Sequence, residues 1–120
     1  MSKPFPPLIL LVEDEPAIRS VVADVIEDAG LQSEVAGNYA DGVVLLHASR
    51  PALLIADVRL PDGDGHQLAA AGRQLGVPTL LISGHPEEIV AAEVSRSAFL
   101  AKPFRLAELR AAIGALIEQR

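Results

Sequence analysis

The chain alternates between short apolar runs and longer amphipathic stretches. Five short segments have the composition of β-strands, at residues 8–13, 31–36, 52–57, 77–83 and 98–101. The first, third and fourth are nearly continuous apolar runs, which is typical of strands buried on both faces of a sheet. The segment 31–36 is more polar and is expected at a sheet edge. The pattern therefore predicts a sheet with a buried centre.

Amphipathic helices are predicted between these strands. Pro16 suits a first helical position, and Gly30 suits the end of the helix that follows it. The apolar positions between them recur with a helical period. They are Ile18, Val21, Val22, Val25, Ile26 and Ala29.

Four further helices complete the alternation. Asn38 can cap the second, whose inward residues are Gly42, Val43 and Leu46. The third is an Ala-rich helix with Leu68, Ala69 and Gly72 on one side. Residues 87–93 are expected to form a brief helix, and the last helix has its apolar stripe at Leu106, Leu109, Ile113, Leu116 and Ile117.

Alternating strands and helices predict an α/β protein. Right-handed crossovers place helices on both faces of a parallel sheet, so we expect a doubly wound (βα)5 fold. A length of 120 residues fits one domain. We assign residues 8–120 to it and expect the proline-rich residues 1–7 to be a flexible lead-in.

Composition narrows the classes of function. The net charge of −6 and the ten Lys and Arg residues argue against direct nucleic-acid binding. No apolar run approaches the ~20 residues of a membrane span, so no membrane contact is expected. The absence of cysteine suits a reducing, cytoplasmic setting.

Polar residues follow the strands in a pattern that indicates chemistry. Glu13 and Asp14 follow the first strand, Asp57 the third, Ser83 the fourth and Lys102 the fifth. Parallel strands bring these ends to one edge of the sheet, where ligands of α/β proteins collect. Crowded carboxylates raise one another's pKa values unless a cation lies among them, and Mg²⁺ is a hard ion that suits such ligands. Asp57 could then attack a phosphoryl group.

Each of these residues taken alone has a simpler explanation. Glu13 and Asp14 could cap the next helix, Asp57 could open a turn, and Lys102 could be a solvated surface charge. The joint hypothesis gains weight because all of them stand at successive strand ends.

Four segments resemble the response-regulator receiver domain of two-component signalling. They are residues 11–15 (LVEDE), 54–65 (LIADVRLPDGDG), 81–84 (LISG) and 99–104 (FLAKPF). The resemblance extends from about Leu8 to the C-terminus. It implies a sheet of strand order 2-1-3-4-5, which is the order of flavodoxin-like doubly wound folds.

The resemblance also implies site residues. Asp57 corresponds to the phosphoacceptor, and Glu13, Asp14, Asp57 and the backbone carbonyl of Arg59 to the ligands of Mg²⁺, for which Mn²⁺ can substitute. Ser83 and Lys102 correspond to the groups that bind phosphoryl oxygens, Ser83 and Phe99 to the switch residues, and Lys102–Pro103 to a cis peptide. Arg59 and His85 match positions that tune the lifetime of the phosphorylated state.

Two departures from the family pattern are visible. The distance from Ser83 to Lys102 is about three residues shorter than usual, so we expect the fourth helix to be curtailed or displaced. Arg105 stands where a capping Asp or Ser is expected, so we expect the last helix to start late or to use another cap.

The resulting functional hypothesis is a phosphoryl-accepting switch. It would take its phosphoryl group from a histidine kinase or a histidine phosphotransfer protein and act on a downstream output protein or domain. A stand-alone receiver and a receiver from a larger regulator or hybrid kinase remain equally open. The alternatives are a small Mg²⁺-dependent phosphohydrolase, a flavodoxin-like cofactor binder and a degenerate receiver-like interaction module. The second residue after Asp57 is Arg59, and the first loop is acidic, which disfavours the first two.

Overall fold

A five-stranded parallel sheet forms the centre of the protein. In the computed structural model, residues 6–85 and 97–118 are described. The strand order is β2-β1-β3-β6-β7, which confirms the predicted order 2-1-3-4-5. The strands are β1 (Leu8–Val12), β2 (Gln32–Ala36), β3 (Leu53–Asp57), β6 (Thr79–Ser83) and β7 (Ala98–Ala101).

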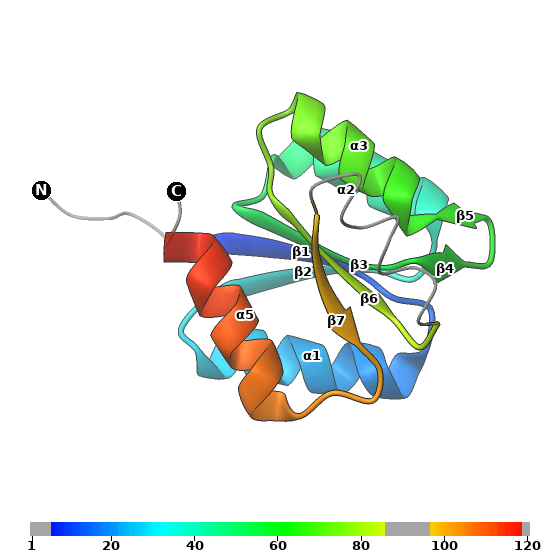
Figure 1. Cartoon of the computed structure of the whole chain (residues 1–120). Coiled ribbons are helices and arrows are strands. Elements are labelled where there is room, and N and C mark those ends of the chain that lie inside the picture. Colours follow the sequence, from blue (N-terminus) through cyan, green and yellow to red (C-terminus); the bar gives the residue numbers. More distant parts are fainter. Residues whose placement is uncertain (1–5, 86–96, 119–120) are drawn as a thin grey trace, which may run out of the picture.

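Helices cover both faces of this sheet. They are α1 (Pro16–Asp28), α2 (Tyr39–Ser49), α3 (Gly65–Gln74) and α5 (Leu106–Glu118). In Figure 1, α1 and α5 lie on one face, and α2 and α3 lie on the other. The helix predicted at residues 87–93 lies outside the described residues. No helix in the described part of the chain has both the length and the apolar character that crossing a bilayer requires.

The central strands contribute side chains to two hydrophobic clusters, one on each face of the sheet, because successive side chains of a strand point to opposite faces. In β1, Ile9 and Leu11 pack toward α1 and α5, whereas Leu10 and Val12 pack toward α2 and α3. All five residues of β3 are buried. Burial on both faces explains why these strands appear in the sequence as unbroken apolar runs.

Helix ends largely follow the predicted signals. Gly30 has a φ of 80° just after α1, and the Asn38 side chain accepts a hydrogen bond from the Asp41 amide at the start of α2. The last helix was expected either to start late or to use another cap, and it does not start late, since α5 begins at Leu106. The expected alternative cap is present, because the Arg105 amide donates to the Glu108 carboxylate at 2.8 Å.

The turn predicted after Asp57 contains a small hairpin. Strands β4 (Arg59–Leu60) and β5 (Gly63–Asp64) pair antiparallel around Pro61 and Asp62. Gly65 then starts α3 so close to β3 that a Cβ atom there would collide with the carbonyl oxygen of Asp57. The hairpin is therefore held directly at the carboxyl end of β3.

Residues 6 and 7, just before β1, are tied to the edge strand β2. The carbonyl of Pro7 accepts a hydrogen bond from the Gln32 amide at 3.0 Å, and the carbonyl of Pro6 accepts one from Gln32 Nε2 at 2.9 Å. Residues 1–5 lie outside the described part of the chain. The division between lead-in and domain at residue 8 stays a prediction.

Candidate functional site

Asp57 stands at the carboxyl end of the central strand β3, with 7% of its surface exposed. The backbone amide of Arg59 donates to Oδ1 at 3.0 Å, and Nζ of Lys102 donates to Oδ2 at 2.7 Å. Both carboxylate oxygens are thus held by donors from different segments. The side chain has a fixed orientation toward the edge of the sheet.

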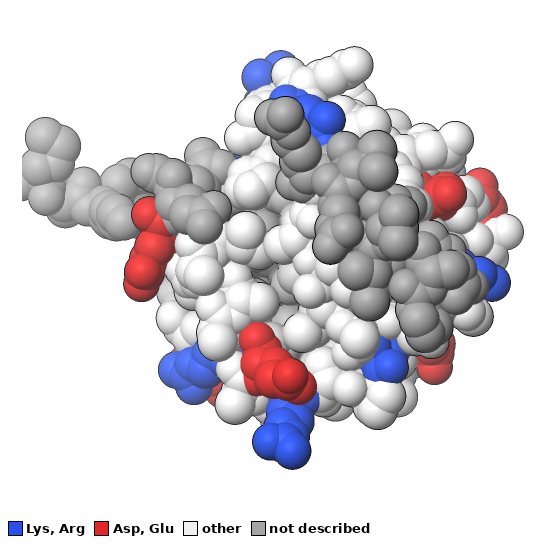
Figure 2. Space-filling model, in the orientation of Figure 1, with Lys and Arg blue, Asp and Glu red and all other residues white. Residues whose placement is uncertain are grey.

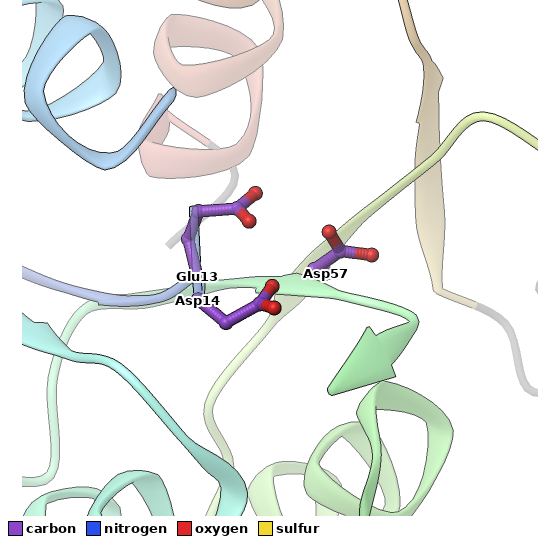
Figure 3. A group of neighbouring side chains, drawn as sticks. All are labelled: Glu13, Asp14 and Asp57. Atoms are coloured by element: carbon purple, nitrogen blue, oxygen red, sulfur yellow. The ribbon is translucent and has the colours of Figure 1, made fainter. Parts of the chain in front are cut away.

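Glu13 and Asp14 bring two more carboxylates to this edge. Glu13 directly follows β1 and is 1% exposed, whereas Asp14 is exposed. One ligand oxygen from each of Glu13, Asp14 and Asp57 lies within 4.8 Å of the other two. Figure 3 shows the three carboxylates converging, with Glu13 and Asp14 opposite Asp57. The predicted acidic group is therefore assembled from two adjacent strand ends.

Lys102 reaches this group from the loop after β7. Its Nζ lies 2.7 Å from Asp57 Oδ2, 3.2 Å from Glu13 Oε1 and 3.7 Å from Glu15 Oε1. Its backbone amide donates to the Ser83 carbonyl at 2.8 Å, and the Lys102–Pro103 peptide bond is cis. A single ammonium group thus partly compensates several carboxylates.

Burial makes Glu13 an unusual acid. Loss of hydration raises its pKa to about 7, and the negative charge of Asp57 adds to the rise, while the Glu15 amide and Lys102 oppose it. Oε2 accepts a hydrogen bond from the Glu15 amide at 3.1 Å. Oε1 lies 3.2 Å from Lys102 Nζ, but no described residue donates an aligned hydrogen bond to it. Oε1 therefore retains unused capacity to bind a cation.

The pKa of Lys102 moves in the direction that keeps it charged. Partial burial alone would lower this pKa, but the hydrogen bond and charge of Asp57, with those of Glu13, outweigh burial and raise it. Lys102 is therefore a cation over the whole physiological pH range.

The remaining predicted residues lie around the acidic group. Ser83 ends β6, is 2% exposed and accepts a hydrogen bond through Oγ from the His85 amide at 3.0 Å. Arg59, the first residue of β4, and His85, in the segment after β6, are both exposed. Phe99 is the second residue of β7 and packs half-buried against the cluster under α2 and α3. Phe99 thus belongs to the hydrophobic packing and is not a member of the acidic group.

Sequence reasoning assigned no role to two residues that contact this group. Glu15 is the third member of the acidic run and approaches Lys102, as given above. Arg19, one turn into α1, donates through Nη1 to the Glu13 carbonyl at 3.2 Å. Glu15 could have been found from its position in the run. Arg19 could not, because a single arginine in the first turn of an amphipathic helix carries no distinguishing signal in the sequence, and its half-burial appears only in the structure.

Known proteins with similar sequences identify the family. The response regulator receiver domain family matches residues 9–114. The KDP operon transcriptional regulatory protein KdpE of Escherichia coli is 36% identical over 107 residues, which are 86% of this chain and 48% of KdpE. The phosphate regulon transcriptional regulatory protein PhoB of Escherichia coli is 32% identical over 118 residues, covering 92% of this chain and 52% of PhoB. The chain thus spans about half the length of these relatives.

Solved structures with the same fold agree. A putative response regulator from Chloroflexus aurantiacus superposes with a TM-score of 0.87 at 26% identity, covering 94% of this chain and 98% of that one. A CheY-like receiver domain protein from Methanospirillum hungatei has a TM-score of 0.88 at 24% identity, with 95% of each chain covered. The family match spans nearly the whole sheet, including the strand ends that carry the acidic group, and the chain belongs to the response regulator receiver domain family.

Proposed function

We propose that Asp57 accepts a phosphoryl group from the phosphohistidine of a histidine kinase or histidine phosphotransfer protein. The observation that carries this proposal is the position of the Asp57 carboxylate. It is nearly buried at the end of β3, fixed by the Arg59 amide and Lys102, and faces the carboxylates of Glu13 and Asp14. A fixed carboxylate beside a cation is suited to nucleophilic attack on phosphorus.

Mg²⁺ fits the donor set of this site. Three carboxylate oxygens lie within 4.8 Å of one another, and hard oxygen ligands are those that Mg²⁺ prefers. Glu13 Oε1 accepts no aligned hydrogen bond from a described residue, and the Asp14 carboxylate is exposed to solvent. We assign the ion to Glu13, Asp14, Asp57 and the Arg59 carbonyl, with Mn²⁺ as a substitute. When bound, the ion would neutralise charge on the phosphoryl oxygens.

The protein's own residues account for the transfer. A carboxylate oxygen of Asp57 forms the new O–P bond, and the N–P bond of the phosphohistidine breaks with its electron pair retained by the imidazole. The Lys102 ammonium pairs with one phosphoryl oxygen, and the Ser83 hydroxyl donates a hydrogen bond to another. Ser83 Oγ is held in place because it accepts a hydrogen bond from the His85 amide. A phosphohydrolase would need an acid–base carboxylate two residues after Asp57. This chain has Arg59 there, which disfavours that alternative.

The output of the switch is proposed to be a change in protein contacts. We assign Ser83 and Phe99 to the transmission of the change toward a downstream output protein or domain. Figure 2 shows Lys and Arg side chains scattered over this face together with acidic ones, and the described atoms on that face form no continuous basic patch. We propose that the receiver itself does not bind nucleic acid directly, which the net charge of −6 favours. We place the protein in the cytoplasm, a setting that its cysteine-free sequence suits.

The test is phosphorylation by a small-molecule donor. The protein is incubated with acetyl phosphate and Mg²⁺, and its intact mass is measured. We expect the wild type to gain one phosphoryl group and Asp57→Asn to gain none, because the amide keeps the shape but cannot attack. Asp24→Asn, an exposed carboxylate of α1, is the matched control and should be labelled normally. Full labelling of Asp57→Asn would refute the assignment.

A further inference from the structure

Asp62, at the tip of the β4–β5 hairpin, caps a helix distant from it in the sequence. Its Oδ1 accepts from the Tyr39 amide at 2.7 Å, and its Oδ2 accepts from the Ala40 amide at 3.0 Å. These are the first two amides of α2, which have no partner within the helix. The third, that of Asp41, donates to the side chain of Asn38 at 2.8 Å. Two different residues thus share the start of α2.

A second contact joins the hairpin to the same turn of α2. A Cβ atom at Gly63 would collide with the ring carbon Cγ of Tyr39, so the ring packs directly on the glycine backbone. The bidentate carboxylate and this ring contact fix the hairpin tip on α2. Hydrogen bonds from Tyr39 and Ala40 also lower the pKa of Asp62, so the cap is ionised at neutral pH.

The other end of the hairpin lies at the proposed phosphorylation site. The Arg59 amide donates to Asp57 Oδ1 at 3.0 Å, and Arg59 pairs with Asp64 across the hairpin. Strands of two residues are too short to hold a geometry by themselves, so the hairpin depends on its anchors. The position of the Arg59 backbone is therefore sensitive to the anchor at Asp62.

We propose that Asp62 is a positioning residue: by fastening the hairpin to the N-terminal turn of α2, it sets the Arg59 backbone at the metal site and couples that site to α2. This inference rests on the proposed function, which assigns the Arg59 carbonyl to Mg²⁺. Coupling is reciprocal. Mg²⁺ binding therefore protects the first turn of α2, and loss of the Asp62 cap weakens Mg²⁺ binding.

The experiment compares two caps of one helix end. Mg²⁺ affinity is measured by calorimetric titration for the wild type, Asp62→Ala and Asn38→Ala. Both variants remove a cap from α2, but only Asp62→Ala releases the hairpin. We expect about tenfold weaker Mg²⁺ binding in Asp62→Ala, near the lower limit for groups that orient metal ligands, and unchanged binding in Asn38→Ala. Asp62→Asn keeps one acceptor oxygen and should be intermediate.

Amide hydrogen exchange gives an independent readout. Mg²⁺ should slow exchange at Tyr39 and Ala40 in the wild type and in Asn38→Ala, but not in Asp62→Ala. Equal Mg²⁺ affinity in all variants, or equal losses in Asp62→Ala and Asn38→Ala, would show a purely structural cap and overturn the inference. If the wild type itself failed to bind Mg²⁺, both the proposed function and the inference about Asp62 would fail. This result differs from the two above, in which the wild type binds Mg²⁺ and only the role of Asp62 is refuted. Circular dichroism verifies folding, and Asp62→Asn provides the test if Asp62→Ala does not fold.

Discussion

At the scale of single residues, Glu13 combines a nearly complete loss of exposure with a carboxylate that must ionise to bind a cation. Its pKa rises from 4.5 to about 7 on folding, chiefly because it is buried. The folded protein therefore holds a proton that the unfolded chain loses between these values. Stability declines as the pH rises from about 4.5 to about 7 and levels off above.

The predicted decline of stability with rising pH can be tested with Glu13→Gln. Without divalent ions, we expect the free energy of unfolding of the wild type to fall by on the order of 2 kcal/mol from pH 5 to pH 8, relative to the variant. The amide has the shape of the protonated acid but does not titrate. The measurement is urea unfolding at several pH values with a chelator present. Parallel pH profiles for the two proteins would show that Glu13 titrates normally.

A second single-residue prediction concerns Arg59, whose side chain is exposed and which stands two residues after the proposed acceptor Asp57. A guanidinium can pair with phosphoryl oxygens and obstruct attacking water. We expect Arg59→Ala to lose its phosphoryl group several-fold faster, which corresponds to about 1 kcal/mol of barrier. Decay is followed by intact mass after donor removal, with Arg73→Ala, an exposed arginine of α3, as the control. Equal or slower decay in Arg59→Ala would end this hypothesis without affecting Asp57.

The role of His85 stays a prediction. Its backbone amide holds Ser83 Oγ, which fixes the loop beside the proposed site. The side chains of His85 and Arg59 are both exposed, and we expect the two to act on the same path for water.

At the scale of elements, the junction of β3 and α3 allows almost no space. A Cβ atom at Gly65 would collide with the Asp57 carbonyl oxygen and lie 2.9 Å from Val58 Cα, both backbone atoms that cannot turn away. We expect Gly65→Ala to cost about 3 kcal/mol of unfolding free energy, as overpacking does, and to impair phosphorylation by displacing Asp57.

Gly114 is the matched control for that substitution. It lies inside α5, and a Cβ atom there would have nothing within 4 Å. Gly114→Ala should therefore stabilise the protein by up to about 1 kcal/mol through helix propensity alone. Chemical unfolding of both variants measures the contrast. A neutral Gly65→Ala would mean that the junction relaxes more easily than this backbone contact implies.

Elements were predictable where local chemistry decides them. Pro16 and Gly30 bracket α1 in the sequence as they do in the structure. At Arg105, whose side chain opposes the helix dipole, the sequence predicted either a late start or another cap and could not decide between them. Glu108, three residues later, supplies the hydrogen bond for the Arg105 amide, so the helix starts at once. A capping residue on the first turn can replace the missing one before the helix.

At the scale of the whole molecule, the proposed Mg²⁺ site joins the ends of β1 and β3, and binding there should stabilise the entire fold. A ligand at 100 times its dissociation constant adds about 2.7 kcal/mol to the free energy of unfolding. We expect Mg²⁺ to raise the Tm of the wild type and to have a much smaller effect on Asp14→Ala. Asp24→Ala, with an exposed acid of α1 removed, should respond as the wild type does. An equal rise of Tm in Asp14→Ala would place the ion elsewhere.

The sequence by itself determined the sheet and the place of its chemistry. Strands such as β1 and β3, buried on both faces, must be apolar throughout, and the polar residue that ends each run marks the edge of the sheet. Because parallel strands end on the same side, Glu13, Asp57, Ser83 and Lys102 could be placed together without coordinates.

Only the tertiary structure decided which of these groups touch and what they do to one another. The ion pair of Lys102 with Asp57 spans 45 residues, and the cap that Asp62 places on α2 spans 23 and 22 residues. In the sequence, Asp62 is an ordinary turn residue, since local propensity describes only its own hairpin. Its second role depends on how the hairpin and α2 pack across the sheet edge. That packing is a sum of long-range contacts, and no local pattern of residues encodes it.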